Sequence, residues 1–215
     1  MERNRIVRLG TGGFMPLRRI QFNERTHRNP ERITNAIVRG APRGFRHISF
    51  EADFPHLDAI RQGLIIAARH GYPRRYFFLR MTVTFHKLHE NEEDNRTEFV
   101  LKFENALRIL RVRQVNLLIS RVPMRLPETN LSCRFDRNHE LLARLIWPLM
   151  CHYCYQRSAH AIGLSNWSVL GLFHIMSLRM IVPHAYIQER FSRRVFLACL
   201  ELNIAYIKRS DFSSR

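Results

Sequence analysis

The first regular pattern of apolar and polar positions predicts a short helix at about 30–39. Asn29, Pro30 and Glu31 are the residue types that favour the cap, the first position and the first turn of a helix. The segment before this helix is rich in Arg and poor in large apolar side chains. We therefore expect residues 1–28 to form a basic extended arm.

The next segment predicts a strand followed by a second helix. Residues 45–50 partly alternate between apolar and polar side chains, which is typical of a strand. A helix is then expected to begin near Asp53 and to end at Gly71. Its apolar positions fall on one helical face: Leu57, Ile60, Leu64, Ile65 and Ala68.

A β-hairpin is predicted at about 76–103. Residues 76–86 are rich in aromatic and β-branched side chains, and residues 96–103 show a looser version of the same pattern. The acidic segment 90–95 lies between them and suits a solvated turn. Its spacing lacks the ligand pattern of a calcium loop.

The remainder of the chain is ambiguous at first and then helical. Residues 104–122 fit a helix and a strand equally well. Helices are expected at about 137–157, bent or broken at Pro148, and at about 167–181 and 184–208.

Together these elements predict the α+β class. The expected units are the arm at 1–28, an α/β part with the hairpin at 29–135, and a helical part at 136–215. The last two parts are expected to pack as one unit.

Charge is the most unusual property of the sequence. The chain has 35 Lys and Arg residues against 18 Asp and Glu residues, a net charge of +17, and its only lysines are Lys87, Lys102 and Lys208. A guanidinium group grips phosphate with two hydrogen bonds and stacks on bases, which favours nucleic acid as the partner, RNA more than DNA. Biased codon use in a compact genome would explain the same arginines without any binding.

The candidate contacts with phosphate are arginines that cluster along the chain. They fall in the expected arm, at 43–46 after the first expected helix, beside the aromatic segment 76–78, and in two later clusters. The set comprises Arg3, Arg5, Arg8, Arg18, Arg19, Arg43, Arg46, Arg74, Arg75, Arg108, Arg111, Arg113, Arg193 and Arg194.

No catalytic residues are expected. The histidines and serines lie outside the GxSxG and HExxH patterns, and the turn at 10–13 lacks the Lys and Ser or Thr that end a phosphate-binding loop. The sequence therefore predicts a non-enzymatic RNA-binding protein. The alternatives are a protein–protein adaptor or antagonist of a host factor, with a hydrophobic groove around Trp147, Trp167 and Tyr186, and a structural component of a ribonucleoprotein such as a nucleocapsid or ribosomal protein.

One short motif suggests a viral source. Leu126 and Pro127, followed by Leu131 and Pro148, resemble the F-box pattern of polerovirus silencing suppressors, although position 130 is Asn where that pattern has Leu or Ile. The resemblance implies a small viral accessory factor that sequesters RNA or suppresses host silencing or innate defence.

A structural zinc ion is the only cofactor that the sequence suggests. Cys133, Cys151, Cys154 and His160 offer the ligand types of a tetrahedral site. Residues 151–154 also fit an apolar helical pattern, which favours buried thiols instead. Four cysteines are too few for a disulfide framework in a chain of 215 residues, so we expect a reducing compartment.

The sequence shows no segment of about 20 apolar residues that would span a bilayer, and no apolar core of a signal peptide. We expect a protein of the cytoplasm or nucleus, in the host cell if it is viral, that is not secreted. An oligomer is compatible with the sequence.

Overall fold

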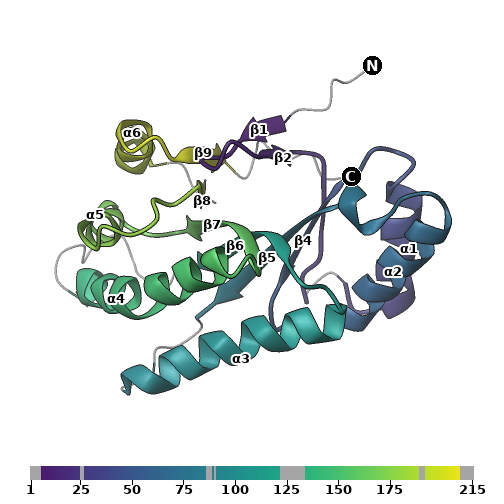
Figure 1. The fold of residues 1–215 in the computed structure, drawn as a ribbon, viewed down its shortest axis with the longest axis horizontal. Helices are drawn as coiled ribbons and strands as arrows, with labels where there is room; N and C mark the ends of the chain where they lie inside the picture. The colour runs from purple at the N-terminus through teal and green to yellow at the C-terminus, as the bar shows by residue number, and fades with distance from the viewer. Residues whose placement is uncertain are drawn as a thin grey trace.

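The computed structural model describes residues 6–24, 27–85, 89, 91–121, 134–188 and 192–208. Its central feature is a seven-stranded parallel sheet in which the strands lie side by side in chain order (Figure 1). The strands are β3 (Arg19–Gln21), β4 (His47–Glu51), β5 (Phe78–Thr84), β6 (Val115–Arg121), β7 (Ala159–Ser165), β8 (Ala185–Gln188) and β9 (Ala205–Lys208).

One α-helix connects each strand of this sheet to the next. The helices are α1 (Pro30–Gly40), α2 (Leu57–Arg69), α3 (Glu92–Leu110), α4 (Arg134–Tyr155), α5 (Val169–Ser177) and α6 (Arg193–Glu201), and a short 3₁₀ helix, Arg74–Tyr76, precedes β5. Strict alternation of strands and helices defines an α/β protein. The predicted α+β class is therefore wrong.

The predicted hairpin at 76–103 is wrong because its second half is helical. Asn91 caps α3, its side chain accepting a hydrogen bond from the Glu93 N–H, and the acidic residues that follow lie in the first turn, where they complement the helix dipole. The acidic segment is thus the beginning of a helix. The buried positions of α3 recur at helical spacing: Phe99, Phe103, Ala106 and Leu110.

The predicted helical part is wrong because β7, β8 and β9 lie within it. Parallel strands that are buried on both faces have continuous apolar runs instead of an alternating pattern. The strand at Ala159–Ser165 fits this description, with one exposed residue among seven. The strands β8 and β9 have four residues each, and a segment of this length is too short to show whether its apolar positions follow the period of a strand or of a helix.

Other predicted elements agree with the structure. α1 begins at Pro30, with the Asn29 side chain accepting hydrogen bonds from two backbone N–H groups of its first turn. α2 is amphipathic, and β4 and β5 lie where strands were expected.

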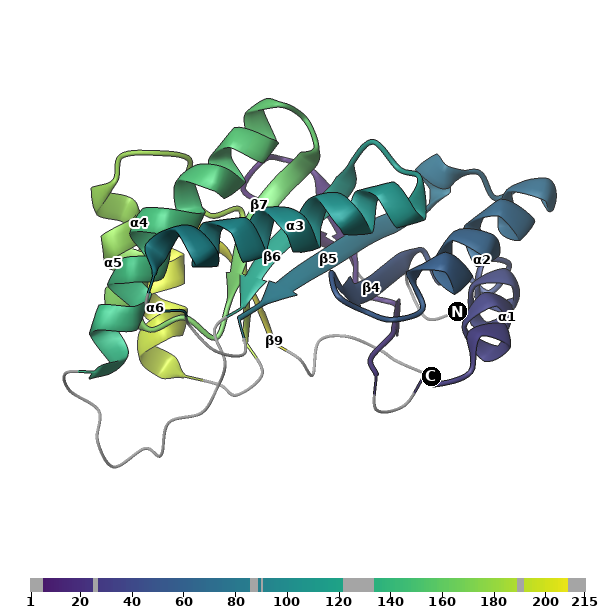
Figure 2. The ribbon, with the colours of Figure 1, turned by 90° about the horizontal axis from the view of Figure 1, so that it is seen from below.

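The two faces of the sheet are buried in different ways. The helices cover the outer face, which Figure 2 shows from the side of α3. The inner face is the concave side of the curled sheet, and its residues form rows that cross the strands in register. One row contains Glu51, Thr82, Ile119, Gly163 and Ala185, and the next row toward the strand ends contains Thr84, Arg121, Ser165 and Ile187.

An antiparallel hairpin of β1 (Ile6–Arg8) and β2 (Phe14–Pro16) packs on the inner face. Met15 and Leu17 share a hydrophobic cluster with Leu117 and Ile119 of β6. Residues 6–24 lie in the segment that was expected to be an arm, and they contribute strands β1, β2 and β3.

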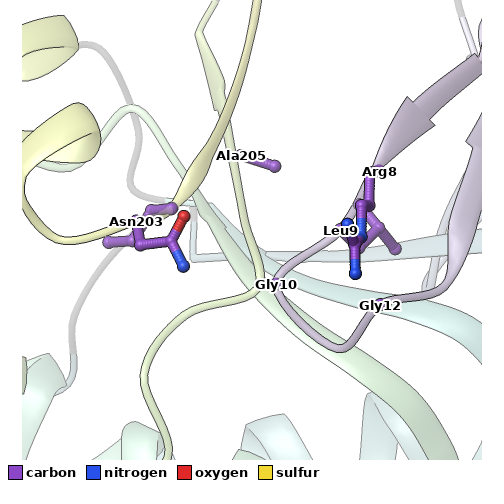
Figure 3. Close-up of a pocket in the computed structure, with 7 residues that line it drawn as sticks. Arg8, Leu9, Gly10, Gly12, Asn203 and Ala205 are labelled. Carbon is purple, nitrogen blue, oxygen red and sulfur yellow. The ribbon is translucent and has the colours of Figure 1, made fainter.

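The described sheet is an open βα-barrel. Its edge strands are β3 and β9, which do not pair with one another. A hollow of about 370 Å³ lies between the β1–β2 turn and the beginning of β9 (Figure 3). Gly10 and Gly12 line it from the turn, and Asn203 and Ala205 line it from the other side.

Close contact of β7 with its neighbours depends on Gly163. A methyl group at this position would lie 2.5 Å from the Ala185 carbonyl oxygen and 2.9 Å from Ile119 Cδ1. We therefore expect Gly163→Ala to lower the free energy of unfolding by about 1–3 kcal/mol, because the inner row must separate to admit the methyl group. Urea denaturation would measure the loss.

Gly13→Ala is the matched control. The nearest atom to its added methyl group would be Thr11 Oγ1 at 3.4 Å, an ordinary contact. This variant should stay within about 0.5 kcal/mol of the wild type. Equal losses in the two variants would contradict the close approach at Gly163.

Candidate functional site

Three polar side chains meet where β4, β5 and β6 end. Glu51 accepts a hydrogen bond from Thr84 Oγ1 at 2.6 Å on one carboxylate oxygen, and its other oxygen lies 2.6 Å from Arg121 Nη1. The side chains of Glu51 and Arg121 are 25% and 20% exposed, so water reaches both. We call this side of the barrel the mouth, and Glu51, Thr84 and Arg121 the mouth cluster.

Lys102 of α3 fixes the helix to this side of the sheet. Its ammonium group lies 3.0 Å from Asp53 and 2.7 Å from Glu98, and it donates a hydrogen bond to the Thr84 carbonyl oxygen at 3.1 Å. Burial alone would lower the pKa of Lys102, but the two carboxylates raise it overall. Lys102 therefore stays charged and holds the backbone beside the mouth cluster in place.

Ser165 continues the row of Thr84 and Arg121 on the next strand. It is buried at the end of β7, and its hydroxyl has no hydrogen-bonding partner among the described residues. A buried polar group without a partner costs about 1–3 kcal/mol, so such a group calls for an explanation. The Ser120 hydroxyl of β6 is equally buried and also lacks a partner among the described residues. Ser120 pairs across the sheet with Val83 and Leu164, which face the helices, so it lies on the outer face and not at the mouth.

The chain after Ser165 is held by hydrogen bonds. Asn166 has a left-handed backbone conformation with φ of 62°. The Trp167 indole N–H then donates to the Ser120 carbonyl oxygen at 3.2 Å, and the buried Tyr186 hydroxyl donates to the Trp167 carbonyl oxygen. These contacts fix the end of β7 at the mouth.

Deeper in the barrel, the inner face carries more buried polar groups. Arg80 donates a hydrogen bond to the Ser49 hydroxyl at 2.6 Å, and His47 Nδ1 lies 2.7 Å from the Pro16 carbonyl oxygen. Burial, together with the charges of Arg80 and Arg19, lowers the pKa of His47 well below its usual value. The imidazole is therefore neutral at physiological pH.

Most of the arginines that the sequence analysis selected lie at the opposite side of the barrel, where the strands begin. Arg74 is structural: its guanidinium donates to the Phe77 and Gln114 carbonyl oxygens, and burial lowers its pKa to about 10. Arg18 and Arg46 lie over the rings of Phe45 and Tyr76. Exposed at or near this side are Arg8, Arg43, Arg75, Arg108, Arg111 and Arg113.

The other selected arginines do not join this group. Arg19 is buried on the inner face, while Arg193 and Arg194 are exposed in the first turn of α6. Arg3 and Arg5 lie outside the described residues.

Helix ends explain part of this arrangement of charge. Arg39, Arg69 and Arg108 lie in the last turns of α1, α2 and α3, and these turns precede the beginnings of strands. A cation in the last turn of a helix interacts favourably with the helix dipole. Part of the positive charge thus stabilises helices at the side away from the mouth.

Three of the four proposed zinc ligands are described. Cys151 is buried and Cys154 half-buried on α4, His160 is exposed on β7, and Cys133 lies outside the described part of the chain. Burial raises the pKa of Cys151 to about 11 and also raises that of Cys154, so both thiols are protonated. Within the described residues, no three His, Cys, Asp or Glu side chains form a group that could hold a metal ion.

Comparison with known proteins connects the chain to one fold. No protein-family model and no curated protein sequence matches it. An aldo-keto reductase from Bombyx mori, in complex with NADP, aligns with 99% of this chain and 68% of its own, at a TM-score of 0.75 and 19% identity. An aldo-keto reductase from Brucella melitensis aligns with 96% of this chain and 72% of its own, at a TM-score of 0.73 and 18% identity.

A third similar structure is an aldo-keto reductase from a Medee basin deep-sea metagenome, which aligns with 94% of this chain and 66% of its own, at a TM-score of 0.67 and 16% identity. The chain therefore has an aldo-keto reductase-like fold, and it spans 66–72% of the length of these three proteins.

This similarity corrects the sequence-based expectations of function. The predicted non-enzymatic, RNA-binding viral accessory factor without a cofactor is wrong, because the fold is that of reductases, one of them in complex with NADP. The expected partners, nucleic acid or a host protein, are corrected with it, because the Bombyx mori reductase of similar fold is in complex with NADP. The resemblance to silencing suppressors is not supported, and Leu126, Pro127 and Leu131 lie outside the described residues.

The sequence analysis found no segment apolar enough to span a bilayer. Among the helices of the described residues, none has the length and apolar character needed to cross a bilayer.

Sequence analysis missed Glu51, Thr84, Arg121 and Ser165. All four are the last residues of strands, where the chain turns toward a helix, and such positions carry the ligand sites of parallel sheets. This signal exists only once the strands are known to be parallel.

His184 lies at the other side of the barrel, beside the β1–β2 turn. The Ile162 N–H donates to His184 Nδ1 at 3.0 Å, and the Gly10 N–H donates to the His184 carbonyl oxygen at 3.1 Å. Burial, and secondarily the charge of His160, lowers the pKa of His184 to about 4. His184 thus links β7, through its neutral ring, to the hairpin, through its backbone carbonyl.

The low pKa of His184 predicts a loss of stability in acid. Between pH 6.5 and about 4 the unfolded chain binds a proton on this residue that the folded chain does not, so the free energy of unfolding falls as the pH is lowered through this range. In His184→Asn the amide oxygen can accept from the Ile162 N–H without titrating. Denaturant titrations from pH 4 to 7 should show that the free energy of unfolding of this variant depends less steeply on pH than that of the wild type.

His152→Asn, at an exposed position on α4, is the control and should keep the wild-type dependence on pH. An identical dependence in all three proteins would contradict the assignment to His184.

Proposed function

We propose that the chain is an oxidoreductase that binds a nicotinamide dinucleotide at the mouth of the barrel and reduces a carbonyl compound there. The observation that carries the proposal is the orphan hydroxyl of Ser165, which continues the row of Thr84 and Arg121 at the strand ends. Active sites of βα-barrels lie at this side. The Bombyx mori reductase of similar fold, described with NADP, supports the choice of ligand.

The polar groups at the end of β7 suit the amide end of a nicotinamide ring. A carboxamide has an N–H₂ donor and a carbonyl acceptor, and a serine hydroxyl can pair with either. Ser165 would supply that hydroxyl, and the adjacent Asn166 would supply a second amide. Because Trp167 and Tyr186 hold this segment in place, the two side chains are preorganised for a ligand that enters at the mouth.

A nicotinamide cofactor supplies a hydride ion when it is bound in its reduced form. The protein must then stabilise the negative charge that develops on the substrate oxygen and admit a proton to it. No tyrosine can stabilise or protonate the substrate oxygen, because all six tyrosines lie away from the mouth. They are Tyr72 and Tyr76 before β5, Tyr153 and Tyr155 at the end of α4, and Tyr186 and Tyr206 on the helix-facing side of the sheet.

Arg121 is the group best placed for this role. Its guanidinium is cationic and partly exposed, and Glu51 orients it by accepting a hydrogen bond at 2.6 Å. It would donate hydrogen bonds to the substrate oxygen as charge develops, which is where preorganised donors accelerate a reaction most. The partial exposure of Glu51 and Arg121 leaves a path for water, which supplies the proton that completes the alcohol.

Binding of NADPH to Ser165→Ala tests the cofactor site without requiring a known substrate. Loss of one hydrogen bond of about 0.5–1.5 kcal/mol should weaken binding about 2- to 12-fold. The measurement is a titration of purified protein with NADPH, followed by the change in NADPH fluorescence, with NADH titrated in parallel.

Ser120→Ala is the matched control, because Ser120 is equally buried and unpartnered in the described structure but faces the helices. It should bind NADPH like the wild type. Equal weakening in the two variants would mean that burial, and not the mouth, explains the effect. Absence of binding of both NADPH and NADH to the wild type would overturn the proposed function.

Arg121→Met tests the catalytic step separately. It keeps much of the side-chain stem and removes the charge, so we expect kcat for NADPH-dependent reduction of an aldehyde such as 4-nitrobenzaldehyde to fall by about 100-fold or more, with the Kd for NADPH within about twofold. Consumption of NADPH, followed by its absorbance, gives the rate.

Arg144→Met provides a comparison at a distance from the mouth. Arg144 lies on α4 and pairs with Glu92 at the surface, so its loss should leave kcat unchanged. Circular dichroism would show that both variants are folded. A kcat for Arg121→Met equal to that of the wild type would remove Arg121 from the mechanism.

A further inference from the structure

The last described helix, α6, has apolar side chains on two faces. Val195, Ala198 and Cys199 are buried and face the sheet. Leu197 and Leu200 point away from it and are 46% and 58% exposed. Two large exposed apolar side chains on a nine-residue helix form a stripe that no described residue covers, which is typical of an interaction surface.

Charged residues flank this stripe in a symmetric order. Arg193 and Glu201 lie four residues before and after Leu197, and Arg194 and Leu200 lie three residues before and after it. Because helical residues three and four apart share a face, all five lie on one side of α6. Arg193, Arg194 and Glu201 are exposed.

The order of these side chains along α6 is complementary to that of a second α6 helix that runs in the opposite direction. If two α6 helices pack antiparallel about a two-fold axis at Leu197, then Leu197 meets its copy, Arg194 meets Leu200 of the other molecule, and Arg193 meets Glu201. The arginine stem can cover the leucine while its charge stays in water. The Leu197 contact lies on the axis, and each of the other two pairings occurs twice, as an isologous interface requires.

The neighbouring helix extends the apolar surface. α5 packs beside α6, and Leu170 and Phe173 on α5 are 50% and 49% exposed (Figure 1). One nine-residue helix is too small for a stable interface, whereas two adjacent helices from each molecule can form a larger layer.

We propose that α6 is the centre of a homodimer interface and that a second copy of this chain, packed antiparallel through Leu197 and Leu200, is its partner. The charge order selects this occupant, because an unrelated partner would not require opposite charges at equal distances from one central leucine. The interface lies on the outer surface of the barrel and does not depend on the proposed oxidoreductase function.

A charge exchange tests the register of the interface. Arg193→Glu should place a carboxylate opposite Glu201 of the other molecule at each end of the contact and weaken the dimer at least tenfold, and Glu201→Arg should do the same with positive charges. The double variant R193E/E201R restores opposite charges and should restore dimerisation. Within one molecule the two residues are about 12 Å apart along the helix, so the rescue reports a contact between molecules.

Sedimentation velocity of the full chain, from about 1 to 100 μM, shows for each variant whether the protein is a monomer of 25.7 kDa or a dimer of twice that mass. Leu197→Lys should abolish the dimer, because it places two like charges on the axis. Arg113→Glu makes the same charge change as Arg193→Glu at an exposed position before β6, and it should leave the dimer intact.

Three results would overturn the proposal. A wild-type protein that is monomeric throughout this range has no such interface. A dimer that survives both Leu197→Lys and Arg193→Glu is formed by another surface. A double variant that stays monomeric while circular dichroism shows it folded excludes the antiparallel register.

Discussion

Burial of both faces of a parallel sheet is the constraint on which the rest of this structure depends. Helical connections cover only the outer face, so the inner face must be buried by the curl of the sheet and by the β1–β2 hairpin. Neighbouring strands approach closely at Gly163, where even a methyl group would meet the backbone of β8. The same curl brings the ends of β4 to β7 together, which assembles Glu51, Thr84, Arg121 and Ser165 from distant parts of the sequence.

The two ends of the barrel have different chemistry as a result. At the mouth, Lys102 and the mouth cluster form a fixed set of charges and hydrogen bonds beside the orphan hydroxyl of Ser165. At the other end, helices terminate, and arginines such as Arg69 and Arg108 complement their dipoles while Arg74 holds a loop. Part of the positive charge that suggested a nucleic-acid partner therefore has local structural roles. The groups proposed to bind a ligand are few, and Ser165 among them is uncharged.

Local signals in the sequence predicted α1, α2 and β4, because caps, glycines and periodicity report on short segments. They could not predict the class of the fold. Asn91 and the acids after it fit a helix start as well as a turn, and only the spacing of Phe99 and Phe103 distinguishes the two. Short buried strands such as β8 and β9 resemble helical segments, since both consist of apolar runs. The mouth cluster depends on long-range register, which no local pattern contains.

The proposed function places a nicotinamide dinucleotide at the mouth and not at the arginine-rich end. Hydrogen–deuterium exchange of the wild-type protein with and without NADPH tests it most directly, because it locates the ligand along the chain. We expect slower exchange at the ends of β4, β6 and β7, including residues 51–54 and 165–168, and no change in the loops at 41–46, 70–76 and 111–114. Protection confined to those loops, or no protection anywhere at saturating NADPH, would contradict it.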